Sequence, residues 1–110
     1  MTTSLAKDEG GVGRQAVADC EDCFEEAVGE LRDSVEELTR LEEETFRWQM
    51  SNVEAWVSAA LTNQVTCLDG LEGCKGRREV GVVRKKVVNA TRATTNALDL
   101  INQLASSRGN

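Results

Sequence analysis

Four cysteines are the residues of this chain whose type and spacing could support chemistry. They form two pairs, Cys20-x2-Cys23 and Cys67-x6-Cys74. Such pairs can form structural disulfides, bind zinc as thiolates or act as a redox centre. The chain contains no histidine, which removes the commonest general base and a common metal ligand.

The zinc and redox alternatives fit this pattern poorly. The C-x6-C spacing is wide for a zinc site, and Cys20 and Cys23 both fall inside a predicted helix. A thioredoxin-like pair needs a strand before its helix, and no period-two alternation runs over any length of the chain. No nucleophile–base motif is present either, so we predict no catalytic residue, no metal and no cofactor, and a protein that is not an enzyme.

The elements that must position these cysteines are three helices, because apolar residues recur every three or four positions. The first helix is predicted over about residues 15–40, with its stripe at Val17, Cys20, Phe24, Val28, Leu31, Val35 and Leu38. The third has its seam at Val80, Val83, Val87, Ala90, Thr94, Ala97, Ile101 and Leu104. The chain has no proline, which suits long uninterrupted helices.

The second helix lies between these two. Ser51 and Glu54 have the spacing of a capping box, which predicts a start near Asn52. Its seam is predicted at Val53, Val57, Ala60, Gln64, Cys67 and Leu71. Gly73 and Gly76 bracket its end and the following loop.

Short connections favour antiparallel neighbours. We therefore predict an all-α, up-down helical bundle of three long helices over residues 15–105. The polar, glycine-rich residues 1–14 are predicted to be a disordered lead-in, and residues 106–110 a frayed tail.

In such a bundle Cys20, near the start of the first helix, neighbours Cys67, near the end of the second, and both lie on inward stripes. A disulfide between them would close a loop of about fifty residues and stabilise the fold by ~4 kcal/mol. Cys23 and Cys74 are carried away from that level in opposite directions. A second disulfide between them would need the 72–77 loop to fold back, and two free thiols or an intermolecular bond are the alternative.

The net charge of −6 argues against nucleic acid as a partner. Residues 17–46 hold twelve acidic and two basic residues, whereas residues 75–92 hold seven basic and one acidic residue. The acidic face is either a solvated helix surface or a docking surface for a basic partner.

No apolar stretch is long enough to span a membrane, and the first residues have no signal-peptide pattern, so the chain taken literally is made in the cytosol.

Asn89-Ala90-Thr91 is a glycosylation sequon, with Asn89 on the outer side of its helix.

Three strings resemble the plant invertase/pectin methylesterase inhibitor family over about residues 15–103. They are VADCEDCFEEAVGELRDSVEEL, VEAWVSAALTNQVTCLDGLEG and VVNATRATTNALDLIN, in the family's order and spacing. The resemblance implies a disulfide between Cys20 and Cys67. It also implies a protein inhibitor that covers the substrate cleft of pectin methylesterase in a one-to-one complex, in the plant cell wall or apoplast.

The chain departs from that family pattern. An N-terminal helical hairpin and the first bundle helix have no counterpart, so one face of the bundle is expected to be open, or covered by the partner or by a second copy. The invertase inhibitors are associated with a Pro-Lys-Phe element, and the absence of proline favours pectin methylesterase over acid invertase as the target. The alternatives are an invertase inhibitor, or a pro-region or truncated remnant without inhibitory activity.

A polar strip just before Cys67 is the predicted partner-binding site. Its residues are Thr62, Asn63, Gln64, Thr66 and, beyond the cysteine, Asp69. At about 100° per residue these side chains occupy more than one helix face, so some point outward. Polar groups on a cross-linked helix can hydrogen-bond to a partner at little ordering cost. The alternative is that they bond within the bundle.

Overall fold

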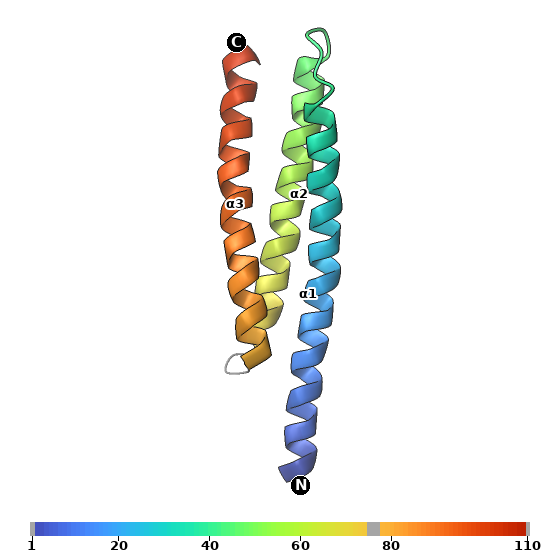
Figure 1. Ribbon diagram of the computed structural model, residues 1–110, viewed down its shortest axis with the longest axis vertical. Coiled ribbons are helices and arrows are strands. Elements are labelled where there is room, and N and C mark those ends of the chain that lie inside the picture. The colour runs from blue at the N-terminus through green and yellow to red at the C-terminus, as the bar shows by residue number, and fades with distance from the viewer. Residues whose placement is uncertain (1, 75–77, 110) are drawn as a thin grey trace.

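Three long helices make up the structure, a computed structural model that describes the backbone of residues 2–74 and 78–109 and the side chains of residues 11–74 and 78–107. The helices are α1 (Thr2–Leu38), α2 (Phe46–Glu72) and α3 (Arg78–Gly109). They run up, down and up, and the N-terminal end of α1 extends beyond the other two (Figure 1). No strand occurs among the described residues, and the predicted all-α antiparallel bundle is confirmed.

The inner face of α2 forms the centre of the core. All six residues of its predicted seam are buried: Val53, Val57, Ala60, Gln64, Cys67 and Leu71. α2 packs along both α1 and α3, whereas α1 and α3 scarcely touch each other. A fully buried valine or leucine stabilises the fold by about 1.5–3 kcal/mol, so α2 supplies much of the energy that holds the three helices together.

The core consists of two apolar clusters at different levels of the bundle. The first contains Cys20, Cys67, Leu71, Cys74, Val80 and Val87. The second lies toward the α1–α2 turn and contains Phe46, Met50, Val53, Val57 and Ile101. All three helices contribute to each cluster, because Phe24 of α1 packs against the first, and Leu31 of α1 packs against the second.

α1 begins at Thr2, not near Gln15, and the segment predicted as a disordered lead-in is helical over residues 2–14. Once the packed part of a helix has formed, each further residue that joins the helix gains one backbone hydrogen bond. Extension therefore avoids the cost of forming a new nucleus. Gly10, Gly11 and Gly13 each cost about 1 kcal/mol relative to alanine, but no proline blocks the helix. Met1 lies outside the described residues.

α2 begins at Phe46, about six residues before the predicted start. The predicted capping box at Ser51 and Glu54 is wrong, because both residues lie inside the helix. Thr45 is the N-cap and makes no side-chain capping bond. Phe46 and Met50 are 6% and 1% exposed, and burying two large apolar side chains outweighs a cap worth about 1 kcal/mol.

The α1–α2 turn is held by the side chain of Gln49. Its Oε1 accepts hydrogen bonds from the Glu42 backbone N–H at 2.8 Å and from the Thr45 hydroxyl at 2.9 Å. Its Nε2 donates to the Arg40 carbonyl at 2.7 Å. Gln49 is 6% exposed, so its side chain is largely shielded from water, and its three bonds fix the path of the turn.

α3 continues to Gly109, beyond the start of the predicted frayed tail, and Asn110 lies outside the described residues. The 106–109 segment carries no helix-breaking proline, so the helix adds its last turn by propagation alone.

α2 ends at Glu72 with Gly73 as its C-cap, as predicted for Gly73, while Gly76 lies outside the described residues. Within the described part of the chain, none of the helices combines the length and apolar content needed to cross a bilayer.

Candidate functional site

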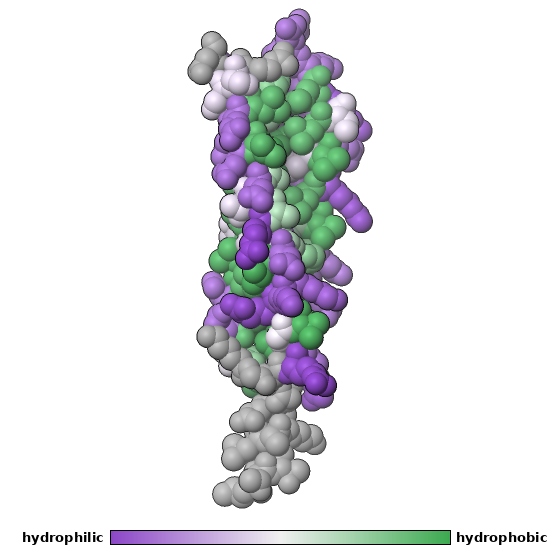
Figure 2. Space-filling model, turned by 60° about the vertical axis from the view of Figure 1, so that its left-hand side comes forward, coloured by the Kyte–Doolittle hydropathy of each residue, from purple (hydrophilic) through white to green (hydrophobic). Residues whose placement is uncertain are grey.

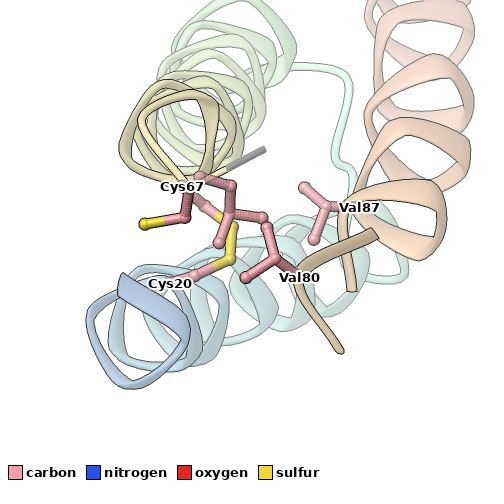
Figure 3. Close-up of a cluster of buried hydrophobic side chains, with 6 residues drawn as sticks. Cys20, Cys67, Val80 and Val87 are labelled. Atoms are coloured by element: carbon pink, nitrogen blue, oxygen red, sulfur yellow. A yellow bond between two sulfur atoms is a disulfide. The ribbon is translucent and has the colours of Figure 1, made fainter. Parts of the chain in front are cut away.

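A disulfide joins α1 to α2. The predicted bond between Cys20 and Cys67 is present, and it links residues 47 positions apart. Both cysteines are 2% exposed. Figure 3 shows the bond between the two helices, with Val80 and Val87 of α3 pointing toward it. The cross-link therefore lies inside the apolar core and fixes α2 against α1.

Cys23 and Cys74 are free thiols, so the second disulfide that the sequence left open is not formed. The Cys74 Sγ lies 3.9 Å from the Val12 carbonyl oxygen, and Val12 precedes Cys23 by eleven residues of α1. At 1.5 Å per residue this places Cys74 about 16 Å along the helix from Cys23. A disulfide needs Cα atoms within about 7 Å, so the two thiols lie too far apart to bond.

The structure divides the predicted polar strip between two faces of α2. Thr62, Thr66 and Asp69 are exposed. Gln64 is 1% exposed and lies on the buried seam. The prediction that Gln64 faces a partner is therefore corrected: it occupies the same side of the helix as Ala60 and Cys67, at the spacing of the core stripe.

Asn63 is half-buried and turned toward α1, where its Nδ2 donates a 2.8 Å hydrogen bond to Glu30 Oε1. About three turns closer to the start of α2, Asn52 Nδ2 donates to Glu37 Oε2 at 3.3 Å. On the opposite side of α2, Glu72 pairs with Arg84 of α3 at 3.3 Å. These polar contacts fix the rotation of α2 about its own axis, because two of them join α2 to α1 and the third joins α2 to α3.

The solvent-facing side of α2 is a continuous surface. Its residues follow one another at steps of 3, 4, 3, 4, 3 and 4, and all are exposed: Trp48, Ser51, Ala55, Ser58, Thr62, Val65 and Asp69. We call this set the outer stripe. Trp48 is 65% and Val65 42% exposed, and the small residues between them leave the helix backbone accessible to close approach.

Sequence reasoning found only Thr62 and Asp69 of the outer stripe. The other five members were not predicted, because the predicted site included only polar residues close to Cys67. A usable signal was present, since the outer stripe repeats the 3,4 spacing of the buried seam on the opposite side of the same helix.

The outer stripe lies between two helices of opposite charge. Residues 11–38 of α1 contain nine acidic and two basic residues, and residues 78–107 of α3 contain five basic and two acidic residues. The candidate site is thus a rigid helix face with an acidic helix on one side and a basic helix on the other.

Within the described residues no group of three or more Cys, Asp and Glu side chains is arranged to hold a metal ion.

Asn89 is exposed on α3, as predicted for a residue that could accept a glycan. The other sequon residue, Thr91, is half-buried, and its hydroxyl donates to the Val87 carbonyl at 2.7 Å. Glycosylation at Asn89 stays a prediction.

The fold and the site define a disulfide-linked helical bundle with one exposed face along its central helix. Residues 1–100 match the family described as "Plant invertase/pectin methylesterase inhibitor". The chain therefore belongs to this family, as its resemblance to the family predicted. No solved structure matches the chain.

Curated plant proteins give the same assignment. The chain is 45% identical to "Pectinesterase inhibitor 9" of Arabidopsis thaliana over 98 residues, covering 84% of this chain and 48% of the relative. It is 45% identical over 98 residues to "Pectinesterase inhibitor 10" of the same plant, covering 86% of this chain and 31% of the relative. It is 32% identical over 97 residues to "Probable pectinesterase/pectinesterase inhibitor 21", also from that plant, covering 87% of this chain and 14% of that relative. The chain thus spans about half or less of the length of these relatives.

Proposed function

We propose that the protein is an inhibitor of pectin methylesterase and not an enzyme, and that the outer stripe of α2 contacts the target. The observation that carries this proposal is an exposed helix face on a helix that is cross-linked to its neighbour by the Cys20–Cys67 bond. Names of the relatives, such as "Pectinesterase inhibitor 9", support this choice of target.

Rigidity is what makes such a face useful for inhibition. A surface that is already ordered before binding loses little conformational entropy in the complex. An exposed tryptophan such as Trp48 is the type of side chain that carries binding energy in protein interfaces, and Thr62 and Asp69 supply polar groups near its other end. We propose a one-to-one complex in which this face covers the substrate cleft of the enzyme.

The test is a titration of a plant pectin methylesterase with the folded, oxidised chain, with methanol release as the readout. We expect activity to fall in proportion to added protein and to reach its minimum at one equivalent. An unchanged rate at a large excess of folded chain would refute the proposal and would favour the alternative of a pro-region or remnant without inhibitory activity.

Matched variants locate the contact surface. Val65→Lys places a long charged side chain on the outer stripe and is expected to weaken inhibition at least tenfold. Val82→Lys makes the same change at an exposed valine of α3, which is 52% exposed, and should leave inhibition unchanged. Equal effects of the two substitutions would contradict the assignment of the outer stripe.

Ionic strength tests the role of the acidic helix. If α1 attracts a basic target, inhibition should weaken as the salt concentration rises from about 0.05 to 0.5 M, because exposed charges are then screened. Inhibition that does not change with salt would indicate a mainly apolar contact.

Acid invertase is the second candidate target, since the family description names invertase as well. The same titration with an acid invertase decides between them. Inhibition of the invertase together with no effect on the esterase would replace the first proposal.

We also propose that the protein acts outside the cell, in the plant cell wall or apoplast. Structural disulfides persist in oxidising compartments, and the Cys20–Cys67 bond is of this kind. Recovery of the oxidised chain from an apoplastic wash of expressing plant tissue would support this location, and recovery only from the protoplast fraction would refute it.

A further inference from the structure

The face of the bundle opposite the outer stripe contains an open apolar groove. α1 and α3 both pack on α2 but scarcely on each other, which leaves a channel between them. A hollow of about 290 Å³ opens in it, with Glu21, Phe24 and Glu25 of α1 on one wall and Val83 and Lys86 of α3 on the other. Figure 2 shows a face on which hydrophobic side chains gather toward the end that carries the α1–α2 turn.

Both walls of this groove continue the apolar pattern beyond the hollow. On α1 the wall residues are Phe24, Val28, Leu31 and Val35, and on α3 they are Val83, Ala90, Ala97 and Leu104. The spacing places each set on one side of its helix, in line with the residue that lines the hollow. Val35 is 61% exposed and Leu104 39% exposed, and the other six are half-buried. An apolar surface of this length usually marks an interface.

The two helices that form the walls carry opposite net charge, and this favours one arrangement of two copies over another. Residues 11–38 hold nine acidic and two basic residues, whereas residues 78–107 hold five basic and two acidic residues. Two copies that bring their grooves together can be related by a two-fold axis parallel to the helices or by one perpendicular to them. The parallel axis places α1 of each copy against α3 of the other, so opposite charges meet. The perpendicular axis places the acidic α1 against a second acidic α1, which is repulsive.

We propose that this groove is the interface of a homodimer whose two-fold axis runs parallel to the helices, with α1 of each copy facing α3 of the other. In this arrangement Glu21 and Glu25 lie near the level of Lys86 of the second copy, because these residues lie at one level in a single copy. The outer stripe of α2 remains free on the outside of the dimer. The proposal goes beyond the inhibitory function, and the two can fail independently.

Sedimentation velocity on the oxidised, full chain tests the dimer. At tens of micromolar we expect a species of twice the 12.0 kDa monomer mass, which dissociates on dilution and at high salt. A chain that remains a 12.0 kDa monomer up to about 1 mM, or one that forms species larger than a dimer, would overturn the proposal.

Substitutions at exposed positions separate the interface from the fold. Val35→Lys in the groove should raise the dimer dissociation constant at least tenfold, while circular dichroism stays unchanged because Val35 is already exposed in the monomer. Val65→Lys on the outer stripe is the matched control and should leave the dimer intact. Equal weakening by both would refute the groove as the interface. Val35→Lys should still inhibit the esterase, so loss of dimerisation is distinguishable from loss of the proposed function.

Cross-linking tests the orientation. A zero-length carbodiimide reagent applied to a mixture of ¹⁴N- and ¹⁵N-labelled chains should give mixed-isotope peptides that join the 21–25 segment of α1 to the 84–86 segment of α3. Mixed-isotope links that join acidic α1 residues only to lysines outside this segment would contradict the parallel axis.

Discussion

Removal of the Cys20–Cys67 bond should cost far more stability than removal of any other sulfur in the core. The bond closes a 47-residue separation, and the loss of chain entropy in the unfolded state amounts to ~4 kcal/mol for a loop of this length. Each cysteine changed to alanine also removes a buried sulfur, which is worth about 1 kcal/mol by analogy with a buried methylene. We therefore expect the Cys20→Ala/Cys67→Ala variant to lose about 6 kcal/mol in free energy of unfolding.

Cys74→Ala is the matched control for this experiment. Cys74 belongs to the same apolar cluster and is 8% exposed but forms no cross-link, so its replacement should cost only about 1 kcal/mol. Since 1 kcal/mol shifts the melting temperature of a domain of this size by about 4 °C, the double variant should melt about 20 °C below Cys74→Ala.

Urea and thermal unfolding followed by circular dichroism under non-reducing conditions provide the measurement. Adding a reductant to the wild type isolates the cross-link itself and should lower the melting temperature by about 15 °C. If the double variant and Cys74→Ala melt within about 3 °C of each other, the entropic reasoning is wrong for this fold.

Three further experiments test polar groups, each by urea denaturation. The hydrogen bond from Asn63 to Glu30 is half-buried, and a double-mutant cycle to alanine should give a coupling energy of about 1 kcal/mol, with zero coupling as the contradicting result. Gln64→Met should stabilise the protein by about 1 kcal/mol, because the Gln64 Oε1 is buried without a hydrogen-bond partner; a loss of stability would show that this oxygen is satisfied. Gln49→Leu removes three hydrogen bonds from the turn and should cost about 2–3 kcal/mol, and a neutral effect would argue that the turn holds its path without them.

The apolar repeat predicted the buried seam of α2 accurately and the stripes of α1 and α3 only in part, since Val35 is 61% and Leu104 39% exposed. The seam of α2 from Val53 to Leu71 is buried at every predicted position, because side chains three and four residues apart must share one side of a helix. That repeat also brought Cys20 and Cys67 to one level, and the two are bonded.

Helix ends were less predictable, because local signals there compete with tertiary packing. Ser51 and Glu54 have the spacing of a capping box, yet burial of Phe46 and Met50 carries the helix upstream past them. Gln49 illustrates the same limit. Nothing in its neighbours along the chain indicates that its amide reaches back to Arg40 and Glu42 across the turn.

The candidate binding residues were predicted only in part for a related reason. Consecutive polar residues such as Thr62, Asn63 and Gln64 point in different directions around the helix axis, so they cannot all face one partner. Composition identified the polar strip, but only the positions of α1 and α3 determine that Asn63 meets Glu30 and that Gln64 is enclosed.

The hairpin of α1 and α2 is closed at both of its ends, covalently by the disulfide and by the Gln49 hydrogen bonds at the turn. Among the described residues α3 has neither kind of closure, and its contacts with the hairpin include apolar packing and the pair between Arg84 and Glu72. Amide protons should accordingly exchange with deuterium in a fixed order, first along α3 and much later in the hairpin. The last helix is thus the one that can detach while the first two remain together.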